Sequence, residues 1–407
     1  MLPCQQMPYL NNIAYCNDTP NVIGLASNIY QLELIKPPDT SFDPISTTTE
    51  EYDEFEYYGT SVENITEKSS QDDSEYYEDA EVEPTNKTKA SVLPAKDFNP
   101  RKDAESLAKA MTELGADEKA IINILTKRSF EQRKEIVKAY HTWLGMNLLE
   151  DLSKEVVGKL KFLVLALMTP LPQYYALELR SAMKGVGTSE SILIEILCTL
   201  TNAEIKEVKK TYVKMFNKQL EDDIRGDTSG NFRKLLLTLC AAKRSEDNNV
   251  NALRAKHLAK KLLRAGEQRT GSDPTVFTWI LTSVSYVQLA EVFRQYKKLA
   301  SHTINDAIRS EFRGIMRISY ETLVKVVLNK QMYFAELLHR SMKGFGTNDK
   351  LLVRVIVSRC EVDLLDIAEH FSKMYGNRLD TWIEDDCSGA YRKCLLSLVG
   401  APDRTMD

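Results

Sequence analysis

The sequence lacks the residue patterns on which several common protein chemistries depend. Seven dispersed cysteines in 407 residues are too few for a disulfide scaffold, and the odd number leaves at least one free thiol. The five histidines form no His-x-x-x-His pair, and no Cys-x-x-Cys motif points to zinc. Because a P-loop, an EF-hand loop and a nucleophile–base set are also missing, we expect no enzymatic role.

Long hydrophobic runs are missing too. The longest apolar stretch, residues 162–168, is far shorter than the ~20 residues of a membrane-spanning helix. The N-terminus has neither the basic region nor the apolar core of a signal peptide. We therefore expect a cytoplasmic protein that contacts membranes only peripherally, with leaderless export or surface association left open.

Charge is distributed unevenly along the chain. Residues 1–97 carry a net charge of −14, whereas residues 98–407 carry +9. A basic body indicates anionic partners or is ordinary solvated surface, and nucleic acid is not expected because no recognition motif accompanies the charge. The acidic tail, which alternates acid and aromatic residues at 50–58, is predicted to be disordered. It is a solvating tail, a tyrosine-phosphorylation segment, a segment that folds back on the body, or a site for a protein partner.

Residues 98–407 have the periodicity of helices nearly throughout, which predicts an all-α fold. Apolar residues recur at the 3.6-residue period after residue 188 and again after residue 347. Thr188 and Thr347 occupy the expected N-cap positions, with Glu190 and Asp349 in the first turns. Similar segments recur, which predicts four stacked repeats. Their expected boundaries are 98–170, 171–243, 244–329 and 330–407.

In each repeat a glycine is followed forty residues later by a carboxylate. The pairs are Gly115 with Glu155, Gly187 with Asp227, Gly271 with Glu311, and Gly346 with Asp386. The glycines are 72, 84 and 75 residues apart, so a constant internal spacing lies within a variable repeat. This pattern indicates two loops that meet in space and offer carbonyl and carboxylate oxygens. Hard cations such as Ca²⁺ prefer these ligands.

The motifs resemble those of the annexin family. The similarity is carried by Met183-Lys-Gly-Val-Gly-Thr188, by Gly226-Asp-Thr-Ser-Gly230, and by Met342-Lys-Gly-Phe-Gly-Thr347 with Asp386-Cys-Ser-Gly389. It covers residues ~98–405 and leaves the tail outside. The resemblance implies five helices per repeat in a curved disc with Ca²⁺ loops on its convex face. It also implies Ca²⁺-dependent binding to anionic, phosphatidylserine-like phospholipid, in which the ion bridges protein and lipid phosphate.

The resemblance also implies the metal ligands of each repeat. Repeats 2 and 4 match the family pattern in full, and their ligands are Met183, Gly185, Gly187 and Asp227, and Met342, Gly344, Gly346 and Asp386. Repeat 3 has a longer loop, with Gly266, Arg269, Gly271 and Glu311 as ligands. In repeat 1 the candidates are Met111, Glu113, Gly115 and Glu155. There Glu113 replaces the first glycine and Ala116 replaces threonine.

Two functions from other classes remain as alternatives. A Ca²⁺-independent helical-repeat scaffold that binds proteins explains the repeats but not the constant forty-residue spacing. An ion conductor, an activity sometimes attributed to the family, would need a route across the bilayer without a spanning segment.

Overall fold

The computed structural model describes residues 75–78, 88–112, 115–185, 187–268, 271–344 and 346–401. Within these ranges all regular secondary structure is helical, and no strand occurs. The all-α prediction is therefore confirmed. The predicted ligands Glu113 and Arg269, and most of the acidic tail, lie outside the described residues.

Each repeat consists of five helices, as predicted. Repeat 1 contains α4 (Pro100–Thr112), α5 (Glu118–Leu125), α6 (Phe130–Leu144), α7 (Leu148–Glu155) and α8 (Gly158–Met168). Repeat 2 contains α9 (Leu171–Met183), α10 (Glu190–Thr199), α11 (Asn202–Phe216), α12 (Leu220–Asp227) and α13 (Gly230–Cys240). Repeat 3 contains α14 (Ala252–Ala265), α15 (Pro274–Ser283), α16 (Tyr286–Ala300), α17 (Ile304–Glu311) and α18 (Gly314–Leu328). Repeat 4 contains α19 (Lys330–Met342), α20 (Asp349–Arg359), α21 (Leu364–Tyr375), α22 (Leu379–Asp386) and α23 (Gly389–Leu398).

Local sequence signals explain where the helices begin. A capping box starts α6 and α11, the third helices of repeats 1 and 2, and α17, the fourth helix of repeat 3. In a capping box, a hydroxyl side chain and the side chain three residues later each accept a bond from the other's backbone N–H. The N-caps of these helices are Ser129, Thr201 and Thr303.

Between the helices, an apolar core runs through all four repeats. Burial of this surface is the main force that holds the short helices together.

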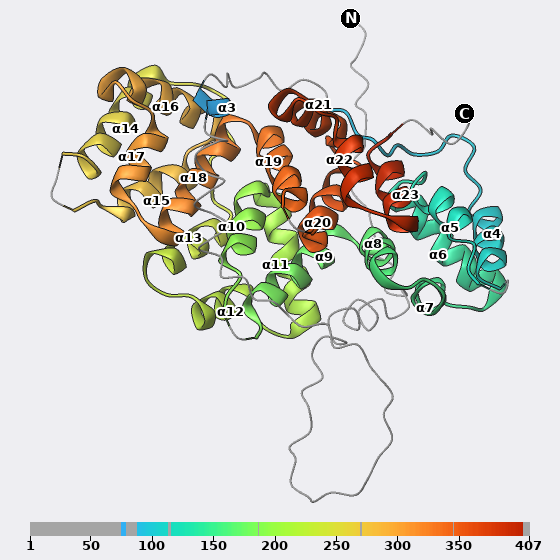
Figure 1. Ribbon diagram of the computed structural model, residues 1–407. Helices are drawn as coiled ribbons and strands as arrows, with labels where there is room; N and C mark the ends of the chain where they lie inside the picture. Colours follow the sequence, from blue (N-terminus) through green and yellow to red (C-terminus); the bar gives the residue numbers. More distant parts are fainter. Residues whose placement is uncertain are drawn as a thin grey trace, which may run out of the picture.

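The repeats are not arranged in space in their order along the chain. In Figure 1, repeats 1 and 3 form the two ends of an elongated body, and repeats 2 and 4 lie between them. Repeat 4 therefore packs on repeat 1, where α20 and α23 contact α8 and α23 contacts α5. On the other side, α10 and α13 of repeat 2 contact α18 of repeat 3.

A buried ion cluster joins repeats 2 and 4. The guanidinium of Arg354 on α20 donates to Glu178 on α9 at 2.7 Å and to both oxygens of Glu195 on α10 at 2.7 and 2.8 Å. All three side chains are at most 7% exposed. Because two carboxylates share one guanidinium away from water, removal of Arg354 would leave two buried negative charges without a partner.

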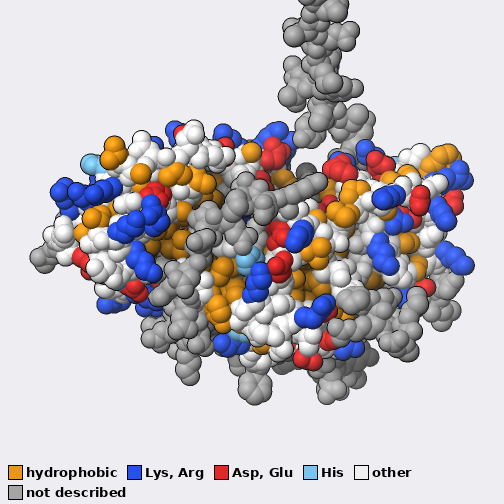
Figure 2. Space-filling model, turned by 90° about the horizontal axis from the view of Figure 1, so that it is seen from above, with side chains coloured by type: hydrophobic (Ala, Val, Ile, Leu, Met, Phe, Trp, Pro, Cys, Tyr) orange, Lys and Arg blue, Asp and Glu red, His pale blue; other side chains and the backbone are white. Residues whose placement is uncertain are grey.

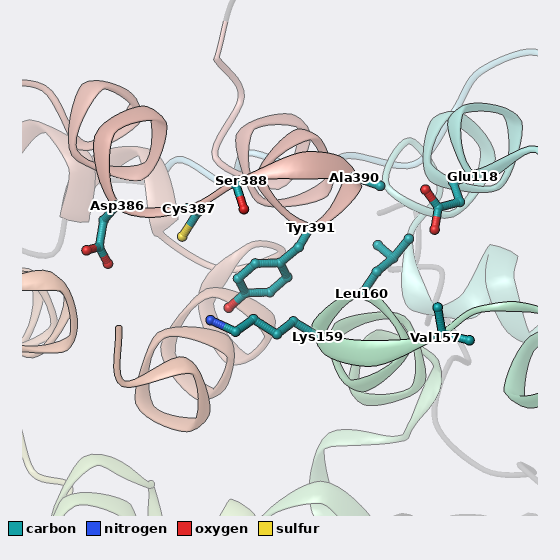
Figure 3. A pocket seen from close by; sticks show the side chains of 9 residues that line it. All are labelled: Glu118, Val157, Lys159, Leu160, Asp386, Cys387, Ser388, Ala390 and Tyr391. Atoms are coloured by element: carbon teal, nitrogen blue, oxygen red, sulfur yellow. The ribbon is translucent and has the colours of Figure 1, made fainter. Parts of the chain in front are cut away.

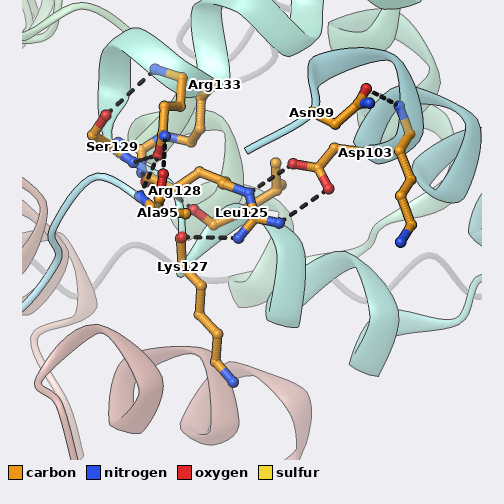
Figure 4. Close-up of polar contacts among 10 residues, drawn as sticks. Ala95, Asn99, Asp103, Leu125, Lys127, Arg128, Ser129 and Arg133 are labelled. Carbon is orange, nitrogen blue, oxygen red and sulfur yellow. Dashed lines mark hydrogen bonds and ion pairs between the residues drawn. The ribbon is translucent and has the colours of Figure 1, made fainter. Parts of the chain in front are cut away.

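Part of the N-terminal segment is bound to the body. Ser91 and Val92 donate their backbone N–H groups to the carbonyl of Cys360 in repeat 4, each at 2.9 Å. A few residues later, Ala95 exchanges two hydrogen bonds with the side chain of Gln132 in repeat 1. Figure 4 shows this region of repeat 1, where Arg128 also pairs with Asp103. Residues 88–97 thus form a strap across the junction of the last and first repeats.

A short helix from the tail also contacts the body. In α3 (Glu75–Glu78), the Tyr77 side chain is 3% exposed and its hydroxyl donates to Glu336 at 3.3 Å. Glu336 forms a buried ion pair with Lys325, whose ammonium lies 5.4 Å from the Tyr77 ring. The neighbouring Tyr76 donates to the carbonyl of Met374 at 2.5 Å. The tail is therefore held against repeats 3 and 4 at this point.

The body surface mixes both signs of charge. Figure 2 shows Lys and Arg side chains dispersed over one face with Asp and Glu side chains between them.

Five cysteines lie in the described part of the chain, and all are buried free thiols. In the described ranges, none of the helices combines the length and the apolar character needed to cross a membrane.

Candidate metal-binding loops

The loop between the first two helices of each repeat has the same backbone frame. In every repeat, an N–H group near the start of the second helix donates to a carbonyl near the end of the first helix. The four bonds are Asp117 to Ala110, Ser189 to Ala182, Asp273 to Ala265, and Asn348 to Ser341, at 2.7–2.8 Å. The bond closes a span of eight residues in repeat 3 and of seven in the others. The longer third loop expected from the sequence is present.

Glycines give the loops of repeats 2 and 4 their shape. Gly185 and Gly187 have φ angles of +120° and +89°, and Gly344 and Gly346 have +127° and +81°. Residues with a Cβ rarely adopt these conformations, which explains why both loops have glycine at alternate positions. No atom lies within 4 Å of the place where a Cβ would project from any of the four. The loops therefore open towards solvent.

The last carbonyls of the preceding helices lie at the entrance to these loops. Helix α9 ends at Met183 and helix α19 ends at Met342, and both side chains are buried. Carbonyls at a helix C-terminus have no partner within the helix and carry part of the negative end of its dipole. The predicted carbonyl ligands of residues 183 and 342 are thus at positions that favour a cation.

The acid forty residues downstream reaches its loop in repeats 2 and 4. The Thr188 hydroxyl donates to Oδ2 of Asp227 at 2.7 Å, and the Thr347 hydroxyl donates to Oδ2 of Asp386 at 2.7 Å. Each bond fixes one oxygen of a partly buried carboxylate beside the glycine loop. Oδ1 remains available to a further ligand. The structure thus brings together the loops and acids that the sequence analysis paired.

These hydroxyl groups correct one prediction. Thr188 and Thr347 were expected to be helix N-caps, but the N-caps of α10 and α20 are the next residues, Ser189 and Asn348. Asn348 caps through its side chain, which accepts from the N–H of Leu351. The threonine side chains bind the distant carboxylates instead, because a charged acceptor makes a stronger hydrogen bond than a neutral one. The expected positions of Glu190 and Asp349 in the first turns are confirmed.

Repeat 3 has a variant of the same arrangement. The Ser272 hydroxyl donates to Oε2 of Glu311 at 2.6 Å, so serine and glutamate replace threonine and aspartate. Gly271 has a φ of +79°, as its counterparts do. Gly266 is the C-cap of α14 with a negative φ, and its Cα lies close to the Phe277 ring, which a Cβ would meet at 3.4 Å.

Repeat 1 lacks the bond between hydroxyl and acid. Gly115 has a positive φ of +89°, and Met111 lies buried in the last turn of α4. Position 116, however, is alanine, and Glu155 at the end of α7 is exposed. No side chain at position 116 can therefore hold the Glu155 carboxylate against the loop.

The hydroxyl at the loop is the functional group that our sequence analysis missed. A signal for it was present, because Thr188, Ser272 and Thr347 each follow the second glycine of the motif, and repeat 1 has alanine there. Only the folded chain shows that these hydroxyls bind the acids of the fourth helices.

A pocket of about 270 Å³ lies beside the acid of repeat 4. Figure 3 shows Asp386 at one edge of this pocket and Lys159, from α8 of repeat 1, extending across it. The Lys159 ammonium pairs with Asp349 at 2.7 Å. The repeat 4 loop thus lies at the junction with repeat 1, and a cation from another repeat approaches it.

The donors in these loops suit a hard cation. Each complete loop offers backbone carbonyls and one oriented carboxylate, with open space for water or another oxygen ligand. Among the described residues, no group of three or more His, Cys, Asp or Glu side chains forms a cluster that could hold a metal by side chains alone. The fold and the loops together define an all-α, four-repeat protein with open oxygen-donor loops.

Comparison with known proteins identifies the family. The annexin family model matches residues 102–167, 174–239, 257–319 and 333–398. Annexin A7 of Homo sapiens is 42% identical over 316 residues, which are 78% of this chain and 65% of that protein. The match therefore spans less than two thirds of annexin A7.

Comparison with solved structures identifies the same family. The structure of annexin III superimposes with a TM-score of 0.76 and 41% identity, covering 78% of this chain and 98% of that chain. Calcium-bound annexin (Sm)1 superimposes with a TM-score of 0.70 and 30% identity, covering 77% of this chain and 93% of that chain. The chain belongs to the annexin family, whose general property is Ca²⁺-dependent binding to phospholipid membranes.

Proposed function

We propose that this protein binds anionic phospholipid membranes through Ca²⁺ held in its interhelical loops. The observation that carries the proposal is the bond between a loop hydroxyl and a distant acid in repeats 2, 3 and 4. This bond holds one carboxylate beside the glycine loop whose carbonyls are the other proposed ligands. Ca²⁺ bound there would have an incomplete protein shell, so that a lipid phosphate oxygen completes it.

The proposed ligands differ between repeats. Repeats 2 and 4 would bind through the carbonyls of residues 183, 185 and 187 with Asp227, and of residues 342, 344 and 346 with Asp386. Repeat 3 would use Gly266, Arg269, Gly271 and Glu311, with Ser272 holding the acid. Repeat 1 would be the weakest site, because its glutamate has no such hydroxyl. We assign no catalytic residue.

Ca²⁺ and lipid should strengthen each other's binding. If the ion bridges protein and phosphate, thermodynamic linkage requires that each ligand raises the affinity of the other by the same factor. Several weak sites on one body also gain from multivalency. The protein would then be peripheral, associating with membranes when Ca²⁺ rises.

Sedimentation with phosphatidylserine vesicles tests the proposal. The wild type should pellet in millimolar Ca²⁺ and stay in solution in chelator. The double variant Asp227→Ala, Asp386→Ala should need at least tenfold more Ca²⁺. The variant Asp222→Ala, Asp385→Ala is the matched control, because these exposed acids lie on the same helices and the loop hydroxyls donate to Asp227 and Asp386 instead. It should behave as the wild type.

Other outcomes would point elsewhere. Binding that persists in chelator would assign the interaction to the basic surface. Absence of binding by the folded protein in both conditions would favour the Ca²⁺-independent protein scaffold. Equal Ca²⁺ requirements for the site variant and the control would contradict the proposed loops.

The acidic tail has a separate proposed role. We propose that it raises the Ca²⁺ needed for binding by lying against the basic body, as the −14 and +9 charges suggest. Deletion of residues 1–74, which keeps α3, should lower the half-maximal Ca²⁺ at low salt. An unchanged value at low salt would leave the tail as a segment for a protein partner or for solvation.

A further inference from the structure

A second pocket lies where repeats 2, 3 and 4 meet. It has a volume of about 250 Å³. The ends of α10, α13 and α15, the start of α16, the linker after α13 and the first residue of α19 line it. Its apolar wall includes Leu197, Leu200, Ile205 and Leu239.

This pocket faces away from the candidate Ca²⁺ loops. Helices α10, α13 and α15 each begin beside a loop or its acid and end at the pocket. Each is 10 or 11 residues long, which corresponds to about 15 Å of helix. A protein bound to a membrane through its loops would therefore keep this pocket open to the aqueous side.

Arg244 brings a positive charge into the pocket with one nitrogen unused. Its Nη1 donates to the carbonyl of Val284 at 2.8 Å, and its guanidinium lies 4.6 Å from the centre of the Tyr286 ring. Two bonds between its backbone and the Asn202 side chain hold the residue in place. Nη2 is buried and has no hydrogen-bond partner among the described residues. An unsatisfied buried donor is costly, so a small rotation of the guanidinium that brings this nitrogen to a ligand acceptor in the pocket would be favoured.

Lys330 brings a second charge into the same pocket. Its ammonium donates to the carbonyl of Thr199 at 2.9 Å. Burial, followed by the nearby Arg359 guanidinium, lowers the pKa of Lys330. Among the described residues, the hydrogen-bond acceptors of the Arg244 guanidinium and the Lys330 ammonium are the carbonyls of Val284 and Thr199, not carboxylates. Two cations without a paired anion in one partly enclosed space favour a negatively charged ligand.

The acids around the pocket do not neutralise these cations. Glu246 lines the pocket but is exposed. Glu204 raises the pKa of Lys330 through its charge, but its carboxylate accepts bonds from the backbone and hydroxyl of Thr201. Asp363 acts on Lys330 in the same direction and forms an ion pair with Arg359.

We propose that this pocket binds a small organic carboxylate with an apolar body. The carboxylate would accept from Arg244 Nη2 and from Lys330, and the apolar part would lie against the leucine side chains. The volume is slightly below the ~300–1,000 Å³ of pockets for drug-sized ligands, which suits a small ligand, and such pockets bind by apolar burial with a few convergent polar groups. The proposal does not depend on Ca²⁺ or on lipid.

Titration calorimetry with octanoate tests this assignment. The full chain is titrated in chelator, so that no Ca²⁺ site competes for the carboxylate. We expect one octanoate per chain, with 1-octanol and acetate each binding at least tenfold more weakly. Octanol tests the charge and acetate tests the apolar body, and neither comparison needs a variant.

Three substitutions locate the site. Arg244→Gln and Lys330→Gln should each weaken octanoate binding about tenfold, because each removes a charged hydrogen-bond donor. Lys243→Gln is the matched control, since it removes the same charge from the exposed residue next to Arg244, and its affinity should equal that of the wild type. Thermal unfolding of each variant checks that it is folded.

Several results would overturn the proposal. These are no octanoate binding, equal binding of octanol, equal binding of acetate, or an affinity that neither pocket variant changes. If a pocket variant does not fold, the comparison of octanoate with octanol and acetate on the wild type decides the matter.

Discussion

The hydroxyl groups that hold the acids at the loops lead to a sharp prediction about Ca²⁺ affinity. Thr188→Val with Thr347→Val removes both hydroxyls while keeping the β-branched shape of the side chain. The carboxylates of Asp227 and Asp386 then lose the bonds of 2.7 Å that fix their Oδ2 atoms. We expect each carboxylate to rotate freely, so that Ca²⁺ must order it on binding.

The size of the effect follows from these bonds. A hydrogen bond to a charged group contributes about 1.5–3 kcal/mol. The carboxylates are only partly buried, so we take the lower end, which corresponds to about tenfold weaker Ca²⁺ binding per site. Loss of a group that orients a metal ligand typically costs ~10–100-fold in affinity, which agrees with this value.

The assay is sedimentation with phosphatidylserine vesicles across a Ca²⁺ series. The half-maximal Ca²⁺ should rise about tenfold in the double valine variant. Thr188→Ser with Thr347→Ser should restore the wild-type value, because serine keeps the hydroxyl. Thr238→Val, which loses only an exposed bond to the carbonyl of Lys234 in its own helix, is the matched control. A shift below twofold in the folded valine variant would refute the reasoning.

Three further predictions concern the body. Arg354→Leu should lower the free energy of unfolding by about 3–5 kcal/mol, because Glu178 and Glu195 become unpaired buried charges. Urea denaturation measures this change, and a loss below 1 kcal/mol would contradict this account. Tyr77→Ala should release α3, so that trypsin cleaves after Lys89 several-fold faster than in the wild type. Tyr77→Phe, which keeps the ring, should have a smaller effect, and equal rates for all three proteins would count against the docking of α3. Burial, followed by the Lys343 charge, lowers the pKa of His339 to about 4, whereas its unfolded value is ~6.5. As the pH falls, the unfolded state therefore binds the proton before the folded state does. The free energy of unfolding should decrease as the pH drops from 6.5 to 4. His339→Phe should remove this part of the pH dependence, and an identical urea midpoint profile in both proteins would exclude it.

Much of the fold could be predicted from local sequence patterns. The apolar stripes predicted after residues 188 and 347 became buried helix faces in α10 and α20. The forty-residue spacing correctly paired each loop with its acid in repeats 2, 3 and 4. The helix stripes and the glycine positions could be predicted because helix periodicity and glycine conformations depend mainly on neighbours in the sequence. The pairing of loops with acids could be predicted because the same spacing recurs in all four repeats.

Distant contacts that follow no repeated spacing could not be predicted from the sequence. Arg354 lies 159 residues from Glu195, and nothing in their local sequences distinguishes this pair from surface charges. Thr188 could cap a helix or bind an acid, and only the position of Asp227 decides between them. Tyr77 lies in an acidic, polar segment that predicts disorder, yet its ring is buried against Lys325 and Glu336.

The contact between the first and last repeats has a consequence for how the chain matures on the ribosome. Helix α8 of repeat 1 packs on α20 and α23, and about 220 residues separate its end from the start of α23. At a synthesis rate of about 5–20 residues per second, repeat 1 waits about 10–40 s for its partner. During that time Leu163 and Val164, fully buried in the finished protein, belong to a repeat that still lacks its neighbour. We therefore expect the nascent chain to need protection of this surface, for example by a holding chaperone, until repeat 4 emerges.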